Sequence, residues 1–323
     1  MKTEVIFGTG PVGLHTAANL IRRGYPVRLV NRSGTLNELR RSVLAEFDPH
    51  LYELRKADAR DRSQVLEASR GAGTIYHCVN PLYHQWAEVL PPVQTNLIEA
   101  ALENDAVLAV SENLYMYARG VDLIDLETPV NPPSRKGRIR LELHEALLAA
   151  GREKGLQWTS IRASDFYGPG SSDQSLFGPT YFLDPLYTGK TMLMPGNPDI
   201  PHCYSYVGDF GRALARAAHE PEALGQSWII GGTSGMTSRN VAELFMDMSG
   251  KSGKLRRLPT WIIRLMGLAD PVMRELLEML YQKEEPYEVS GRHFEQQFDF
   301  VLTEPRKAVT ETIEWYEALK TQG

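Results

Sequence analysis

The chain has 323 residues, 42% of them hydrophobic and 23% charged, which is ordinary for a globular protein and enough to bury a large core. Its net charge of −5 gives no overall basic field for nucleic acid or membrane, and no apolar run reaches the roughly 20 residues that span a bilayer. Since the N-terminus lacks a signal-peptide pattern and Cys78 and Cys203 have no metal-ligand spacing, we expect a cytoplasmic protein without a metal.

The first predicted elements surround a glycine-rich turn. Residues 4–7 form a short apolar run typical of a buried strand, and from Leu14 apolar side chains recur at i, i+3, i+4 and i+7, as on one face of a helix. Residues 27–30 predict a second strand. Between the first strand and the helix, G-x-G-x-x-G predicts that the backbone and the helix N-terminus hold a dinucleotide pyrophosphate. The residues assigned to this contact are Gly8, Thr9, Gly10, Pro11, Val12 and Gly13.

The end of the second predicted strand bears on the choice of dinucleotide. An acidic residue there would accept hydrogen bonds from the NAD ribose, but this sequence has Asn31, Arg32 and Ser33. Because arginine can pair with a 2′-phosphate and serine can donate to it, the sequence favours NADP(H) over NAD(H). Arg32 as a solvated charge at the strand end is the alternative.

Two further strand ends are assigned to the cofactor. The segment 51–61 predicts a third strand that delivers Asp58 and Ala59 to its carboxyl end, where Asp58 contacts the adenine or caps the next helix. Residues 74–81 predict a fourth strand, and Val79 and Asn80 at its end are further predicted cofactor contacts.

The order of the later segments is more specific than any single motif. The chain continues with SENLYMYA, IRASDFYGPG, YSYVGDFGRALARAA and a closing amphipathic helix that ends near Tyr316. This order resembles the extended short-chain dehydrogenase/reductase superfamily, in its NAD-dependent epimerase/dehydratase group. The resemblance implies an α/β fold with a doubly wound parallel Rossmann-type sheet and a smaller, discontinuous C-terminal substrate lobe. We expect residues 1–163 and 204–236 to bind the dinucleotide, and 164–203 and 237–323 to form the substrate lobe.

The resemblance also implies a catalytic set that this chain lacks. In the family a Ser or Thr, a Tyr and a Lys carry the reaction; the corresponding positions here hold Asn113, Lys136 and Arg140. Arg140 can still bind the nicotinamide ribose, but it cannot exchange protons near neutral pH. Tyr115, two residues beyond Asn113, is a candidate to deliver the proton, or it only lines the pocket. Lys136 as the proton donor is a further alternative.

Substrate contacts and function remain broad at this level. Residues expected to contact a small-molecule substrate are Tyr83, His84, Trp86 and Tyr167. We predict an atypical NADP-dependent oxidoreductase that transfers a hydride to a carbonyl or activated double bond, with Tyr115, Arg140 and Asn113 as catalytic residues. The alternatives are a redox-sensing regulator similar to NmrA-like proteins, without catalysis, and an NAD(P)-dependent epimerase/dehydratase with relocated catalytic residues. The resemblance also allows a homodimer, because family members often dimerise through helices that flank the sheet.

Overall fold

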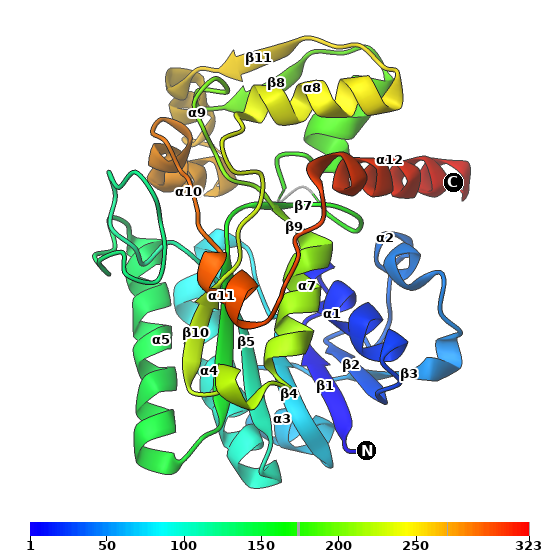
Figure 1. Cartoon of the computed structure of the whole chain (residues 1–323), viewed down its shortest axis with the longest axis vertical. Coiled ribbons are helices and arrows are strands. Elements are labelled where there is room, and N and C mark those ends of the chain that lie inside the picture. The colour runs from blue at the N-terminus through cyan, green and yellow to red at the C-terminus, as the bar shows by residue number, and fades with distance from the viewer. Residues whose placement is uncertain (173–174, 270, 323) are drawn as a thin grey trace. The chain divides into compact units, whose positions relative to one another are not determined.

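The computed structural model describes residues 1–172, 175–269 and 271–322. The chain folds into two compact units, shown together in Figure 1. Unit 1 contains Met1–Asn113, Arg138–Arg162 and Gly208–Trp228, and unit 2 contains Leu114–Gly137, Ala163–Val207 and the chain from Ile229 onward. The sequence-based division places residues 114–137, 204–207 and 229–236 with the dinucleotide-binding part, whereas their contacts group them with unit 2.

Unit 1 is built on a seven-stranded sheet in the order β10-β6-β5-β4-β1-β2-β3. The strands are β1 (Thr3–Phe7), β2 (Val27–Asn31), β3 (Tyr52–Lys56), β4 (Ala72–His77), β5 (Val107–Asn113), β6 (Trp158–Ala163) and β10 (Gln226–Ile229). The strand order reverses direction between β1 and β4, which pair in parallel, and ligands of open α/β sheets bind at the carboxyl side of such a switch point. The predicted doubly wound Rossmann-type fold is confirmed.

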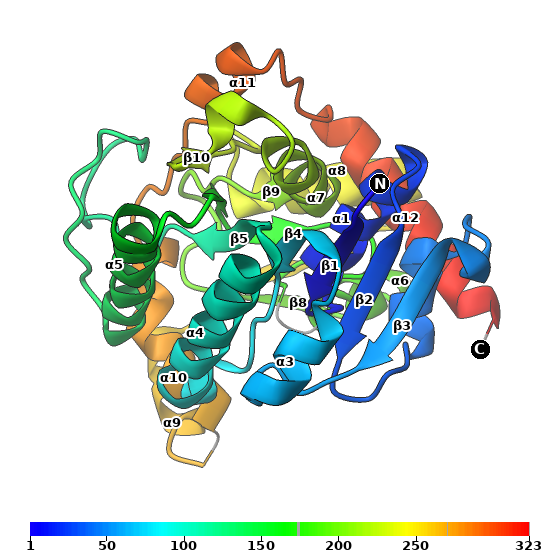
Figure 2. The ribbon, with the colours of Figure 1, turned by 90° about the horizontal axis from the view of Figure 1, so that it is seen from below.

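Helices cover both faces of this sheet. They are α1 (Pro11–Arg22), α2 (Glu38–Arg41), α3 (Arg62–Ala68), α4 (Trp86–Asn104), α5 (Arg135–Lys154) and α7 (Val207–Ala217). Figure 2 shows α3, α4 and α5 on one face and α1 and α7 on the other. A buried cluster that includes Val5, Ile75, Leu97 and Leu108 joins the sheet to its helices, as the near-continuous apolar runs of parallel strands predict.

Unit 2 contains small parallel sheets and short helices. Its strands are β7 (Phe166–Tyr167), β8 (Met192–Pro195), β9 (Ser205–Tyr206) and β11 (Leu255–Leu258); β7 pairs with β9 and β8 with β11. Its helices are α6 (Asp184–Tyr187), α8 (Ser238–Ser249), α9 (Thr260–Met266), α10 (Pro271–Met279), α11 (Arg292–Gln297) and α12 (Pro305–Gln322). The long helix α12 packs against α8.

Candidate functional site

The turn between β1 and α1 has the geometry expected of a dinucleotide-binding loop. Gly8 has a φ of +103°, and a Cβ at this position would overlap the backbone of Cys78 in the adjoining segment after β4. A Cβ at Gly13 would overlap the carbonyl oxygen of Gly8, so α1 and the turn touch backbone to backbone. Gly10 is different, because no protein atom lies within 4 Å of the position that its Cβ would take. The first and third glycines therefore hold the turn closed, while the second leaves open space.

The open space lies at the N-terminus of α1. No side chain caps this helix, its first turn has no acidic residue, and Pro11 begins it. Its first N–H groups and the positive end of its dipole are thus available to an anion, the arrangement that binds the pyrophosphate of dinucleotides. The residues present fit a dinucleotide cofactor.

At the end of β2, the Asn31 side chain organises the following loop. Its Oδ1 accepts hydrogen bonds from the Ser33 amide at 3.0 Å, the Ser33 hydroxyl at 2.9 Å and the Gly34 amide at 2.7 Å. Its Nδ2 donates to the buried Thr9 hydroxyl at 3.0 Å, which links this loop to the glycine turn. Arg32 is exposed. The loop therefore presents Arg32 and contains no carboxylate at the position that would bind a ribose.

At the end of β3, Asp58 is held by an arginine. The Arg60 side chain and amide both donate to its carboxylate, and Arg60 and the nearby charge of Arg32 lower the pKa of Asp58. The predicted alternative, in which Asp58 caps the next helix, is wrong: Asp61 caps α3 by accepting from the Gln64 amide. The carbonyl of Ala59, the neighbouring predicted contact, accepts from the buried Asn96 side chain at 3.0 Å.

Arg140 of α5 lies against the segment that follows β4. Its guanidinium stacks over the Trp86 ring at 4.3 Å from the ring centre and donates to the Asn80 side chain at 3.2 Å. Trp86 itself is buried, and Tyr83 packs edge-on against it. Trp86 therefore supports Arg140, and its ring has little exposed surface with which to make the predicted contact with a substrate. His84 is exposed, and Val79 beside Asn80 is half-buried.

Next to Arg140 is a buried ionisable network that the sequence did not indicate. Arg162 of β6 donates to the Glu112 carboxylate of β5 at 2.9 Å, and His144 of α5 lies 3.7 Å from the same carboxylate. Burial, the largest single effect, raises the pKa of Glu112, but the charges and hydrogen bonds of its neighbours, Arg162 first among them, together lower it. The pKa of His77 falls to about 3 because the ring is buried and Arg140 is close, so it stays neutral.

The first turn of α5 belongs to unit 2 and contains Lys136. The Ser134 hydroxyl caps the helix by accepting from the Gly137 amide at 2.9 Å. Lys136 is buried and donates to Glu275 and Glu278 of α10, to Glu278 at 2.6 Å. Its side chain is not solvated, because it is buried and ion-paired with two carboxylates. This geometry argues against Lys136 as the proton donor.

Gly137 lies directly against the backbone of Tyr115, the predicted catalytic tyrosine. A Cβ at Gly137 would overlap the carbonyl oxygen of Tyr115, so the glycine permits a close approach of α5 to the segment after β5. Tyr115 is buried and Asn113, the last residue of β5, is half-buried. Gly137 was not predicted as a site residue, because a glycine has no side chain that carries chemistry.

Tyr167, a predicted substrate contact, lies in an aromatic core of unit 2. Its ring meets Phe177, Tyr206 and Phe245 with centre distances of 6.3, 5.9 and 6.2 Å, and it is 1% exposed. These contacts explain Tyr167 as a packing residue and argue against the predicted role.

The neighbouring Asp165 takes part in a buried charge cluster. Lys283 donates to the Asp165 carboxylate at 2.5 Å, to His202 Nε2 at 2.7 Å and to the Tyr204 hydroxyl at 3.3 Å. His202 Nδ1 faces the Gln282 carbonyl, which can only accept, so Nδ1 carries the hydrogen and Nε2 accepts from Lys283. Burial and the Lys283 charge lower the pKa of His202 to about 4. All three Lys283 donors are thus satisfied by partners from two segments that are distant from it in the sequence.

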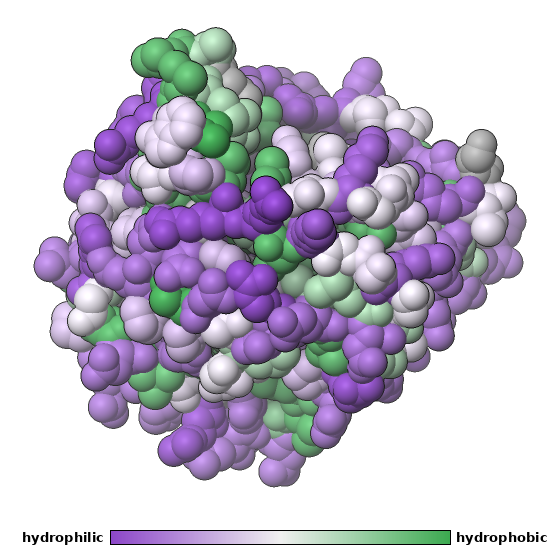
Figure 3. Space-filling view, turned by 90° about the horizontal axis from the view of Figure 1, so that it is seen from above, coloured by the Kyte–Doolittle hydropathy of each residue, from purple (hydrophilic) through white to green (hydrophobic). Residues whose placement is uncertain are grey.

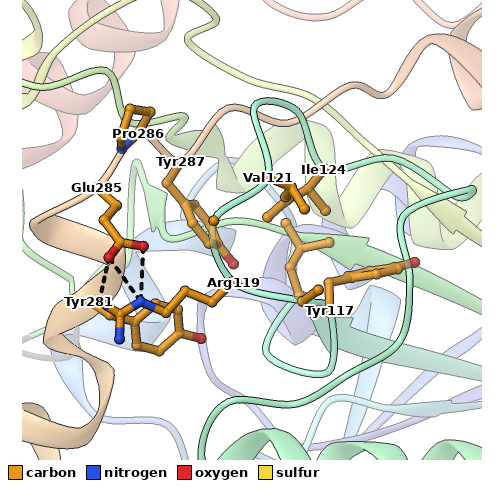
Figure 4. Close-up of a pocket in the computed structure, with 11 residues that line it drawn as sticks. Tyr117, Arg119, Val121, Ile124, Tyr281, Glu285, Pro286 and Tyr287 are labelled. Carbon is orange, nitrogen blue, oxygen red and sulfur yellow. Dashed lines mark hydrogen bonds and ion pairs between the residues drawn. The ribbon is translucent and has the colours of Figure 1, made fainter.

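A separate small cavity in unit 2 is shown in Figure 4. Its volume is about 10 Å³, at the lower limit for one water molecule. Arg119 and Glu285 form an ion pair at its edge, and Arg119 lies over the Tyr281 ring. The buried Tyr287 hydroxyl has no hydrogen-bond partner among the described residues. The cavity is too small for an organic substrate.

Among the described residues, no group of three or more His, Cys, Asp or Glu side chains could hold a metal ion. None of the described helices combines the length and apolar character needed to cross a bilayer.

The seven-stranded parallel sheet and the turn after β1 define a protein with a Rossmann-type unit. The sequence model of the NAD dependent epimerase/dehydratase family matches residues 5–231, more than half of the chain. The chain therefore belongs to the NAD-dependent epimerase/dehydratase family, and the predicted family resemblance is confirmed.

Two relatives with names are similar over most of the chain. A putative UDP-glucose 4-epimerase from Methanocaldococcus jannaschii is 23% identical over 214 residues, covering 64% of this chain and 70% of the relative. UDP-N-acetyl-alpha-D-glucosaminuronate decarboxylase from Bacillus cytotoxicus is 21% identical over 267 residues, covering 78% of this chain and 81% of the relative.

Solved structures share the fold over the whole length. UDP-glucuronic acid 4-epimerase from Bacillus cereus in complex with NAD has a TM-score of 0.79 at 13% identity, covering 99% of this chain and 98% of that one. A structure of UDP-glucuronic acid 4-epimerase from the same organism with UDP-glucuronic acid and NAD has a TM-score of 0.77 at 15% identity, covering 98% and 99%. At such identities the likeness establishes the fold alone.

Proposed function

We propose that this protein is an NAD(P)-dependent epimerase or dehydratase that acts on a nucleotide sugar with catalytic side chains other than Tyr-x-x-x-Lys. The observation that carries the proposal is the turn after β1, which has the dinucleotide-binding geometry in a chain that the family model matches over residues 5–231. The names of the relatives, two epimerases and a decarboxylase of UDP-sugars, support this alternative over the predicted net reduction of a carbonyl.

The cofactor would be held by residues of unit 1. The turn from Gly8 to Gly13 and the free N-terminus of α1 would bind the pyrophosphate, and the ends of β2 and β3 would contact the adenosine half. Arg140, fixed by Trp86 and Asn80, would bind the nicotinamide ribose. The chemistry that such a cofactor supplies is reversible hydride transfer.

Proton transfer to and from the substrate oxygen requires a residue other than Arg140. Arg140 keeps a permanent charge that stabilises a developing oxyanion, but it cannot give up a proton near neutral pH. The Asn113 amide can donate a hydrogen bond to the same oxygen. Tyr115 is the residue we assign to proton transfer, because it follows Asn113 by two positions and has a phenolic hydroxyl.

Turnover of a panel of UDP- and dTDP-sugars with either cofactor tests these assignments. We expect Tyr115→Phe to lower kcat about 100-fold or more, as loss of a general acid-base group does. Arg140→Ala should weaken cofactor binding and also lower kcat. Tyr117→Phe is the matched control, a buried tyrosine two residues further along, and should retain most activity. Unchanged turnover in both Tyr115→Phe and Arg140→Ala, with circular dichroism confirming the fold, would sink the assignment.

The cofactor choice is a separate proposal. The exposed Arg32 and the absence of a carboxylate at the end of β2 support NADP(H), whereas the named structures contain NAD. Fluorescence titration should show tighter binding of NADPH than NADH, with the difference lost in Arg32→Ala. Arg62→Ala, which removes an exposed arginine paired with Glu99, serves as the charge-matched control. Equal binding of NADH and NADPH to the unaltered protein would contradict the 2′-phosphate site.

A further inference from the structure

Helix α9 of unit 2 turns most of its apolar side chains outward. Ile263 is fully buried and anchors the helix, which is only two turns long. Ile262 is half-buried, and four other large apolar side chains on and just after the helix are exposed: Trp261 66%, Leu265 62%, Met266 43% and Leu268 76%. In the view of Figure 3, hydrophobic side chains gather over the part of unit 2 that contains α9. We name these four residues the α9 patch; such a contiguous patch usually marks a contact with another surface.

The segment around the patch is basic, in contrast to the chain as a whole. Residues 251–269 contain five lysines and arginines and no acidic residue, so the rest of the chain carries −10 against the overall −5. Arg257 is paired with Glu284 at 2.7 Å, while Lys254, Arg256 and Arg264 are exposed. Arg274 adds a further charge at the end of α9, where it donates to the Gly267 carbonyl at 3.0 Å.

The exposed strand face beside α9 continues this combination. Arg256 of β11 is the register partner of Leu193 of β8, and both side chains are exposed. Because register partners on parallel strands point to the same side, a cation and an apolar side chain stand next to each other there as well. From the net charge of −5 we expected no attraction to a membrane, but that sum does not show that residues 251–269 are basic while the rest of the chain is acidic.

We propose that the α9 patch and its basic flank bind peripherally to an anionic membrane surface. Trp and Leu side chains insert at the headgroup level while Lys and Arg contact anionic lipids, which is how short interfacial helices bind without crossing the bilayer. A second copy of this chain is a poorer occupant, since an isologous contact would bring two basic segments together and like charges repel.

Trp261 is a built-in probe of this binding. The other four tryptophans are each at most 8% exposed, so acrylamide quenching of the native protein reports mainly on Trp261. With vesicles of phosphatidylglycerol and phosphatidylcholine we expect a blue shift and loss of quenching, and with pure phosphatidylcholine neither. Binding should weaken as salt is added, because salt screens exposed charges.

Variants separate the two parts of the surface. Leu265→Asp with Leu268→Asp should abolish sedimentation with anionic vesicles, whereas Val301→Asp, an equally exposed apolar site outside α9 and β11, should not. Arg256→Gln should weaken vesicle binding about fivefold, since one cation near an anionic surface contributes about 1 kcal/mol.

Three results would overturn the proposal. These are equal binding to both kinds of vesicle, vesicle binding that survives the double Asp variant, and protection of Trp261 without lipid that accompanies a doubled mass in light scattering. The third result would identify a second copy of the chain as the occupant. None of these measurements depends on the proposed enzymatic activity.

Discussion

Lowering the pH from about 7 to about 5 should destabilise this protein through two buried neutral histidines. His77 ends β4 of unit 1, and its Nδ1 is buried without a hydrogen bond among the described residues. His202 of unit 2 accepts from Lys283 through Nε2. Burial is the main cause that lowers both pKa values, to about 3 and about 4, from the ordinary value of 6.5.

The sign follows from which state binds protons. In the unfolded chain both rings protonate as the pH falls through 6.5, whereas in the folded protein they stay neutral until about pH 4 or below. The stability present above pH 6.5 is therefore lost progressively as the pH falls through this window. At about pH 5 each ring costs roughly 2 kcal/mol relative to pH 7, or about 4 kcal/mol together. Carboxylates with lowered pKa values, such as Asp61, act mainly below about pH 4.

Urea unfolding followed by circular dichroism at the two pH values measures this loss. His77→Gln and His202→Gln remove the titrating groups, so each variant should lose less stability on acidification than the unaltered protein. His50→Gln, at an exposed position, should behave as the unaltered protein does. A free energy of unfolding that is the same within about 1 kcal/mol at both pH values would refute the reasoning.

Three further predictions follow from individual contacts. Gly13→Ala should abolish dinucleotide binding in a fluorescence titration, because its Cβ would overlap the turn backbone; retained affinity would contradict the geometry. Lys283→Met should lower the free energy of unfolding in urea by about 3 kcal/mol, because it leaves the Asp165 charge without its partner. Adding Asp165→Asn to this variant should recover part of the loss. If the effects of the two substitutions on the free energy of unfolding simply add, the two residues are not coupled. Lys136→Arg, which keeps the charge facing Glu278, should leave the pH profile of turnover unchanged, whereas loss of turnover with the fold intact would favour Lys136 as the proton donor.

The dinucleotide-binding half of the fold could be predicted because its signals are local. The alternation of apolar runs with helical periodicity, and the glycines at 8, 10 and 13, depend on residues close together in the chain. The turn geometry required by such glycines is set by backbone overlap within a few residues and with the next strand.

The surroundings of the candidate catalytic residues could not be predicted, because they depend on distant segments. Lys136 was an alternative candidate for proton donor, but its partners Glu275 and Glu278 lie about 140 residues further along the chain. Asp165 and Lys283 are 118 residues apart in the sequence. A single sequence gives no signal that such charges meet, since each alone is typical of a solvated surface.

Aromatic residues near the predicted site show the same difficulty. Tyr167 and Trp86 follow strands at the edge where ligands bind, which favoured substrate contacts. Their rings are instead buried, Tyr167 in an aromatic core and Trp86 beneath Arg140. Position along a strand determines the edge at which a side chain lies, but packing determines whether it faces a ligand.

The most direct test of the proposed function is product analysis by NMR after incubation with NAD or NADP and a panel of UDP- and dTDP-sugars. The account predicts an epimerised or dehydrated sugar without net change in the cofactor, and no product with Gly13→Ala. Stoichiometric oxidation or reduction of the cofactor would contradict it in favour of a net oxidoreductase. Tight cofactor binding with no conversion of any nucleotide sugar would contradict it in favour of a sensor that binds the cofactor without catalysis.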